Sequence, residues 1–111
     1  MTYEERVKTI EEIERANPAR FLKTGGTYDR NFWGDKFIIK GTIENNATVA
    51  DYKDVQIEIV CYSKTETELL RKNHTFYDFF SAHSKRNFEL AMDRPDACEK
   101  LDWKVVGATP K

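Results

Sequence analysis

The sequence predicts an all-β fold: an antiparallel β-sandwich of about seven strands that follows one N-terminal α-helix. Apolar and polar residues alternate in two runs, 37–43 and 55–61, which is the pattern of strands with one face on a core and one in water. Turn-forming residues recur roughly every eight to twelve positions, which is typical of sandwiches. We expect the helix within residues 1–18 and the sandwich within residues 19–111.

Length and composition fit one globular domain. The chain has 111 residues, near the commonest domain size, and 40% of them are hydrophobic. Its 18 basic and 19 acidic side chains nearly cancel to a net charge of −1, so no long-range field gathers phosphates and no nucleic-acid partner is expected. No stretch approaches the ~20 apolar residues of a membrane span.

The start of the chain leaves its compartment open. The residues after Met1 lack the chemistry of a signal peptide. The chain is therefore expected either to be cytoplasmic or to begin where a leader or a preceding domain was removed.

An amphipathic helix is predicted over residues 2–16, with Thr2 and Glu5 as a capping box and Asn17-Pro18 as its end. Its apolar stripe consists of Tyr3, Val7, Ile10 and Ile13. Its wet face is expected to carry Glu4, Glu5, Glu11, Glu12 and Glu14. A helix of this length is marginal alone in water, so we expect the stripe to pack on the sandwich. The alternative is a helix that docks on a partner.

The first strand candidates lie on either side of an aromatic turn. A weak strand over residues 20–28 contains Gly25-Gly26, which we interpret as a bulge or bend in an edge strand. Residues 31–35 form the turn into a strong strand that Asn45-Asn46 ends, with asparagines suited to left-handed turn positions.

The second half of the chain supplies the remaining strands. Residues 63–66 connect a hairpin whose returning strand, 68–77, is polar and is therefore expected near an edge. Residues 79–84 are predicted to form a loop. Two further alternating strands are predicted over residues 87–92 and 101–105.

Three motifs share their spacing with a known family. They are Phe37-x-x-x-Gly41-x-Ile43-x-Asn45, then Tyr52-Lys53-Asp54-Val55-x-Ile57-x-Ile59 with Tyr62, and Ser84-Lys85-x-x-Phe88-x-Leu90. This pattern resembles FxLYD-type, immunoglobulin-like β-sandwich domains over about residues 36–107. The resemblance implies an accessory domain of bacterial cell-envelope or secreted proteins. It therefore implies an exported location, periplasmic, cell-surface or secreted, and no general catalytic activity.

The two cysteines, Cys61 and Cys98, lack the close pairing that structural zinc sites need. Cys61 shares the inward parity of Ile57 and Ile59, so it is expected to act as a small buried hydrophobe. A Cys61–Cys98 disulfide is the alternative, if the two strands meet across the core.

Catalytic and metal-binding patterns are missing from the sequence. His74 and His83 fit no metal-ligand spacing, and both are expected in solvent. No phosphate-binding glycine motif and no nucleophile elbow occurs. We therefore expect no enzyme, no cofactor and no metal.

Aromatic residues offer the best functional indication. Tyr28, Phe32 and Trp33 gather around one turn, and Tyr77, Phe79 and Phe80 lie near another. We expect Trp33 and Phe79 to cover the ends of the core; the alternative is exposed rings that bind a sugar or a protein.

Two functions follow. The first is a non-catalytic, protein-interaction or accessory domain whose contact surfaces are the polar strand 68–77 and the N-terminal helix. The second is a carbohydrate- or small-ligand-binding module with Tyr28, Phe32 and Trp33 as a stacking platform. The sequence gives no indication of the oligomeric state.

Overall fold

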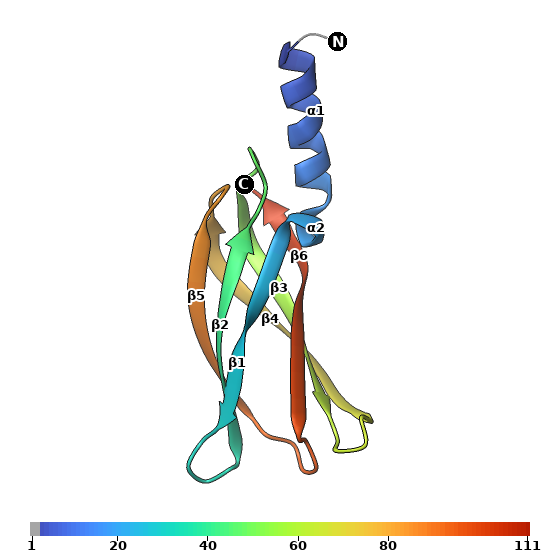
Figure 1. Cartoon of the computed structure of the whole chain (residues 1–111), viewed down its shortest axis with the longest axis vertical. Coiled ribbons are helices and arrows are strands. Elements are labelled where there is room, and N and C mark those ends of the chain that lie inside the picture. Colours follow the sequence, from blue (N-terminus) through green and yellow to red (C-terminus); the bar gives the residue numbers. More distant parts are fainter. Residues whose placement is uncertain (1–2) are drawn as a thin grey trace.

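The computed structural model describes the backbone of residues 3–111 and the side chains of residues 9–111. The predicted capping box of Thr2 and Glu5, and the side chains of Tyr3 and Val7, lie outside the described residues. The described part is mostly β, with two helices and six strands (Figure 1). In chain order these are α1 (Tyr3–Ala16), α2 (Pro18–Phe21), β1 (Leu22–Arg30), β2 (Lys36–Asn45), β3 (Tyr52–Tyr62), β4 (Glu68–Phe80), β5 (Lys85–Asp93) and β6 (Lys100–Pro110).

The strands form two antiparallel three-stranded sheets. One sheet has the order β1-β2-β5 and the other β4-β3-β6, so the two strongest sequence runs are the central strands. Figure 1 shows the sheets as two layers. The all-β prediction is confirmed at this level, and β4 lies at a sheet edge, as its polar sequence predicts.

The alternating residues face the core as predicted. Phe37, Ile39 and Ile43 of β2 are buried, and so are Ile57 and Cys61 of β3. Strand β5 contributes Met92, and β6 contributes Leu101 and Val105. Each central strand thus places one apolar row between the sheets, where burial of apolar area stabilises the fold.

The structure has six strands among the described residues where about seven were predicted, and several of them are longer than predicted. Strand β4 alone runs 13 residues and ends at Phe80, so it includes the start of the segment that we expected to be a loop. Phe80 is buried and faces Tyr52 of β3, and this packing extends the strand.

Gly25-Gly26 was expected to form a bulge or bend in an edge strand. Strand β1 does lie at the edge of its sheet, but it pairs with β2 in an unbroken register, so there is no bulge. Gly26 has a φ of +135° and pairs with Gly41. A Cβ on Gly26 would lie 2.3 Å from the Lys40 carbonyl oxygen. Gly26 is therefore required by close backbone approach and not by an inserted residue, whereas a Cβ on Gly25 would meet nothing within 4 Å.

Asn45 ends β2, but it does not adopt the left-handed conformation that we expected. Its side chain is fully buried. The amide nitrogen donates to the carbonyl oxygens of Ala50 and Phe80, and the amide oxygen accepts from the Ala47 backbone N–H. Asn45 therefore holds the loop 46–51 on the sandwich through its side chain.

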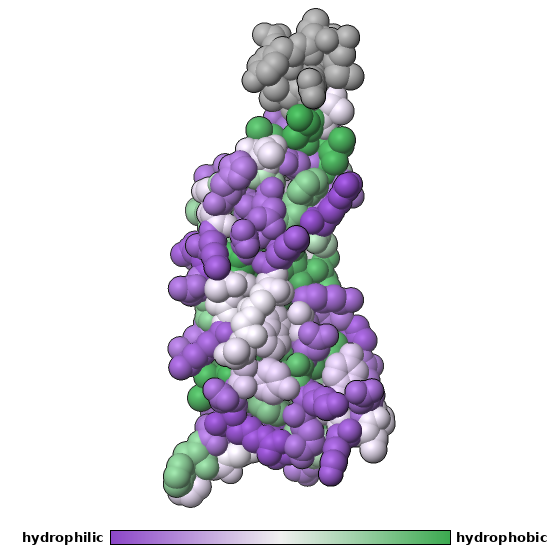
Figure 2. Space-filling model, viewed as in Figure 1, coloured by the Kyte–Doolittle hydropathy of each residue, from purple (hydrophilic) through white to green (hydrophobic). Residues whose placement is uncertain are grey.

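Helix α1 projects from one end of the sandwich, which corrects the expectation that its stripe packs there (Figure 1). Ile10 and Ile13 remain 39% and 44% exposed. Figure 2 shows apolar surface on α1 beside hydrophilic surface. The radius of gyration is 16.7 Å, against about 13 Å for a compact domain of this length. The molecule is therefore elongated.

Glu14 anchors the base of this helix, although we expected it on the wet face. Its side chain is buried, with a relative exposure of 3%. The carboxylate accepts hydrogen bonds from the backbone N–H groups of Thr48, Val49 and Ala50 and from the Thr48 hydroxyl, at 2.7–3.1 Å. The Tyr52 hydroxyl donates to the Glu14 carbonyl oxygen. Glu14 follows Ile10 by four residues, about one helical turn, so it lies on the same side of the helix as the apolar stripe. Four hydrogen-bond donors satisfy its charge.

The burial and hydrogen bonding at the base of α1 shift the pKa values of Glu14 and Tyr52. Burial alone raises the pKa of Glu14, but the hydrogen bonds from Thr48, Val49 and Ala50 outweigh it and the pKa lies below its ordinary value. Burial, together with the nearby Glu14 charge, raises the pKa of Tyr52 to about 12.

Neither helix in the described residues is both long and apolar enough to cross a membrane.

Candidate functional site

The loop between β1 and β2 lies at the end of the sandwich opposite α1 (Figure 1). Two aromatic side chains on this loop stand in solvent. Phe32 is 91% exposed and Trp33 is 81% exposed, which corrects the expectation that Trp33 covers the core. Their ring centroids lie 5.1 Å apart, with the planes at 87°. We call the loop 31–35 with these two rings the aromatic tip.

Asn31 shapes the aromatic tip from inside the loop. Its side-chain oxygen accepts from the backbone N–H groups of Asp35 and Lys36 at 3.1 and 3.2 Å, and its side-chain nitrogen donates to Asp35 at 2.7 Å. The Gly34 N–H donates to the Asn31 carbonyl oxygen at 3.0 Å. Gly34 has a φ of +73°, a conformation that glycine adopts at no steric cost. The turn is thus closed by its own first residue.

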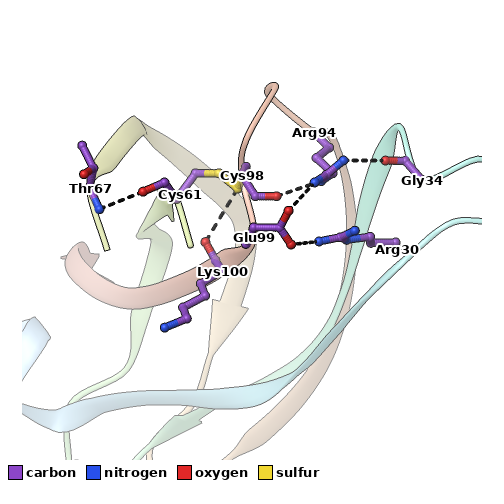
Figure 3. The surroundings of a disulfide bond; sticks show 9 residues. Arg30, Gly34, Cys61, Thr67, Arg94, Cys98, Glu99 and Lys100 are labelled. Atoms are coloured by element: carbon purple, nitrogen blue, oxygen red, sulfur yellow. Dashed lines mark hydrogen bonds and ion pairs between the residues drawn. A yellow bond between two sulfur atoms is a disulfide. The ribbon is translucent and has the colours of Figure 1, made fainter. Parts of the chain in front are cut away.

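Arg94 holds the aromatic tip from the neighbouring loop between β5 and β6. Its backbone N–H donates to the Asp35 carbonyl oxygen at 2.8 Å, and its guanidinium reaches the Gly34 carbonyl oxygen at 3.4 Å. The same guanidinium donates to the Cys98 carbonyl oxygen at 2.8 Å. Figure 3 shows Arg94 between these two carbonyl groups. Arg94 therefore links the tip loop to the cysteine-bearing loop.

Glu99 completes this network. Its carboxylate pairs with Arg94 at 3.2 Å and with Arg30, at the end of β1, on the other oxygen (Figure 3). The Arg30 hydrogen bond holds the pKa of Glu99 below its ordinary value, and Arg94 contributes to the same shift. Exposed ion pairs contribute little singly, so the chief effect of this network is to orient Arg94.

A disulfide between Cys61 of β3 and Cys98 secures the loop that carries Arg94 (Figure 3). The two Cα atoms are 5.8 Å apart, within the usual range for a disulfide. Both cysteines are fully buried. The sequence left open whether the two cysteines pair; in the structure they form a disulfide, which fixes Cys98 to the central strand β3. The tip is connected to the core through Cys98 and Arg94.

Tyr28 does not belong to the aromatic tip. It lies on β1 and is half-buried. Its ring contacts Phe37 at 5.8 Å and Trp103 at 6.0 Å between centroids. Of the three residues that we expected to form a platform, the structure brings together Phe32 and Trp33 and assigns Tyr28 to the packing between the sheets.

The edge strand β4 carries the second exposed aromatic pair. Tyr77 is 82% exposed and Phe79 is 58% exposed, so Phe79 does not cover the end of the core. The strand also carries Arg71, which pairs with Glu58 and Glu68. Charges and a register shift between Lys53 and Val55 on β3 interrupt this edge, as is usual for edges that resist strand addition.

The histidines lie apart from each other. His83 is exposed, but His74 is half-buried against the ring of Phe76, at 4.7 Å, contrary to the expectation of a solvated residue. This burial, with the charge of Lys72, lowers the pKa of His74. Within the described residues, no group of three or more His, Cys, Asp or Glu side chains is arranged to hold a metal ion.

Sequence reasoning placed Phe32 and Trp33 in a turn but expected Trp33 to lie against the core. It missed Arg94 and Glu99, which hold that turn in place. Asn31 lies in the predicted turn, and asparagine is a common turn residue, but its side-chain hydrogen bonds to Asp35 and Lys36 were not predicted. Arg94 and Glu99 carry no local signal, because their partners Gly34 and Arg30 lie 60 and 69 residues earlier in the chain. Comparison of the chain with protein-family models, with curated proteins and with solved structures finds no match.

Proposed function

We propose that this domain is a non-catalytic protein-interaction module that binds its partner through the aromatic tip. The observation that carries the proposal is the exposure of Phe32 and Trp33, at 91% and 81%, on a loop whose backbone is fixed by hydrogen bonds. Large rings are rarely left in water at a fixed position, and binding hot spots are enriched in aromatic residues.

The network around the tip supports this proposal. A loop that is ordered before binding loses less conformational entropy when a partner covers it. Asn31 closes the turn, and Arg94 ties it to the Cys98 loop. These contacts favour a preorganised contact site over a loop that happens to contain aromatic residues.

The ring geometry favours a protein over a carbohydrate. The planes of Phe32 and Trp33 stand at 87°, so the two rings do not offer one continuous flat face on which a sugar could stack. Tyr28, the third member of the expected platform, packs on Phe37 and Trp103. A perpendicular pair instead offers a convex knob of the kind that fills an apolar pocket on a protein.

The cellular compartment in which the domain works is part of the same proposal. A disulfide between buried cysteines supports an oxidising location, which agrees with the exported, immunoglobulin-like accessory domains that the sequence resembles. We therefore propose that the domain works in the cell envelope or outside the cell.

The test compares exposed aromatic residues in two places. Phe32→Ala and Trp33→Ala remove the tip, and Tyr77→Ala removes an equally exposed ring from β4. A protein retained by the wild-type domain from an extract of its own source is purified, and its affinity for each variant is measured by calorimetry. We expect Trp33→Ala to weaken binding by about thirtyfold or more, as for a hot spot, and Tyr77→Ala to change it by less than about threefold.

Equal losses in Trp33→Ala and Tyr77→Ala would contradict the proposal. A glycan array, followed by tryptophan emission of the wild type with each candidate sugar, tests the carbohydrate alternative. A sugar that changes Trp33 emission, and whose binding is lost in Trp33→Ala, would replace the protein partner with a carbohydrate.

A further inference from the structure

The loop between β5 and β6, residues 94–99, is held by backbone hydrogen bonds at its two ends only. At one end Arg94 donates to the loop of the aromatic tip, and at the other the Glu99 N–H donates to the last residue of β3 at 2.9 Å. Between them, the backbone of residues 95–98 makes no hydrogen bond to a strand in the described part of the chain. The bond from Cys98 to β3 therefore fixes the middle of the loop.

The middle of this loop also holds one residue in an unfavourable conformation. Ala97 has a φ of +68°, which is sterically costly for a residue with a Cβ. Such conformations persist only where the surrounding structure imposes them. Cys98, the next residue, is fully buried and covalently bound to a central strand, so it supplies this constraint. When the covalent bond is opened, Ala97 can relax and the loop can change its shape.

The carbonyl group of Cys98 transmits the shape of the loop to the aromatic tip. It accepts the Arg94 Nε–H at 2.8 Å, and the same guanidinium reaches the Gly34 carbonyl oxygen at 3.4 Å (Figure 3). A guanidinium is a rigid planar fork, so the contact on one of its nitrogens sets the direction of the others. A displaced Cys98 carbonyl group would therefore turn Arg94 away from Gly34.

We propose that the Cys61–Cys98 bond makes the aromatic tip redox-sensitive: reduction by a dithiol frees Cys98, and the tip loses its fixed shape. The protein S–S bond takes up two electrons and two protons and becomes two thiols, while the dithiol becomes a cyclic disulfide. Both cysteines are fully buried, so the reductant attacks only when the loop 94–99 opens. A consequence for partner binding rests on the function proposed for the tip, whereas the loss of order does not.

Nitrogen relaxation of the oxidised and the reduced domain tests this inference without a partner. Dithiothreitol is the reductant, and it has one target, because the chain has two cysteines. The mass after alkylation with iodoacetamide shows whether both thiols are free. We expect the order parameters of amides 31–36 to fall from near 0.85 to about 0.7 or lower.

The loop 81–84 between β4 and β5 is the control within the same spectra. It also contains a non-glycine residue with a positive φ, His83 at +61°, but no cysteine. Its order parameters should therefore be the same in both forms. Equal losses of order in the loop 81–84 and in the tip would overturn the inference, because reduction would then loosen the whole domain.

Arg94→Ala tests the route from the disulfide to the tip. The contacts that reduction is expected to break are already absent in this variant, so reduction should change the order of residues 31–36 much less than in the wild type. Arg86→Ala is the matched control, because Arg86 also binds a backbone carbonyl group, that of Phe79 at 3.0 Å. It should keep the wild-type response to reduction. An equal response in Arg94→Ala and the wild type would overturn the proposed route.

Affinity gives a second measurement. The probe is the protein purified by its retention on the oxidised wild-type domain, and we expect reduction to weaken its binding by about tenfold. Coupling between two sites is reciprocal, so the bound probe should shift the thiol–disulfide equilibrium by the same factor towards the oxidised form. A probe that binds without shifting this equilibrium would overturn the coupling.

The outcomes separate this inference from the proposed function. Unchanged order of the tip after complete reduction overturns the inference, and so does the loss of all native signals, because a reduced domain that stays folded is required. Lost order with unchanged affinity supports the inference and contradicts the proposed function, which needs a preorganised tip. A probe whose binding does not depend on Trp33 also contradicts the proposed function and leaves the relaxation result standing.

Discussion

Among single residues, two buried polar side chains, Glu14 and Asn45, fix the base of α1 and the loop before β3. Glu14 holds α1 through four donors of the Thr48–Ala50 segment, and Asn45 holds that segment from below. A buried carboxylate is stable only when it is hydrogen-bonded, so removal of its charge should release the helix base.

Glu14→Gln tests this anchor. Glutamine offers one acceptor oxygen, and its NH₂ group meets backbone donors, so we expect the free energy of unfolding to fall by about 1–3 kcal/mol. Amide exchange at Thr48, Val49 and Ala50 should accelerate. Glu12→Gln, on an exposed position of the same helix, is the matched control and should change neither measurement. Unchanged exchange at the three amides in Glu14→Gln would contradict the role of Glu14.

The lowered pKa of Glu14 gives the anchor a pH dependence. Because the folded-state pKa lies below the unfolded one, the stabilisation is fully present above the ordinary pKa of glutamate, about 4.3, and is lost as the pH falls through the folded-state value. Unfolding curves between neutral and acidic pH should therefore lose less stability in Glu14→Gln than in the wild type.

The role of a single residue could be predicted from the sequence only where its interaction partners lie near it in the chain. The alternating core residues, such as Ile39 and Ile57, were predictable because strand periodicity is local. Glu14 was assigned to the wet face by its residue type, because its donors lie 34 to 36 residues later. The exposure of Trp33 was not predictable either, since it depends on which side chains the fold brings to the turn.

At the scale of elements, the disulfide ties the loop between β5 and β6 to the central strand β3. The 37-residue separation of Cys61 and Cys98 makes the bond a strong constraint on the unfolded chain. The order of the strands could not be read from the sequence, because it depends on non-local pairing: β2 pairs with β5 and β3 with β6.

The Cys61→Ala/Cys98→Ala double variant should lower the free energy of unfolding by about 2–4 kcal/mol, measured by urea denaturation. Wild-type protein treated with dithiothreitol should lose a similar amount. The Glu68–Phe80 strand should keep its amide protection, because its pairing with β3 does not depend on the bond. Equal stability of the double variant and the untreated wild type would contradict the structural role of the disulfide.

At the scale of the whole molecule, the domain presents two different ends. Helix α1 projects at one end with Ile10 and Ile13 in solvent, and the aromatic tip lies at the other (Figure 1). The principal-axis extents of 59 × 24 × 17 Å describe a rod-like domain. Such a shape suits a spacer that carries separate contact sites.

Small-angle X-ray scattering tests this shape. We expect a radius of gyration near the Cα value of 16.7 Å, enlarged slightly by the hydration layer. Glu14→Gln should broaden the distance distribution, because its helix is no longer fixed at the base. A value of about 13 Å, as for a compact domain of this length, would show that α1 folds back on the sandwich.

The proposed function requires an aromatic tip that is both exposed and rigid before any partner binds. Nitrogen relaxation of the amides of residues 31–36, together with the Trp33 indole, measures the rigidity directly. We expect order parameters near 0.85 for the wild-type amides, typical of rigid backbone, and lower values in Arg94→Ala, which loses the contacts to Gly34 and Cys98. Order parameters below about 0.6 in the wild type would contradict a preorganised tip.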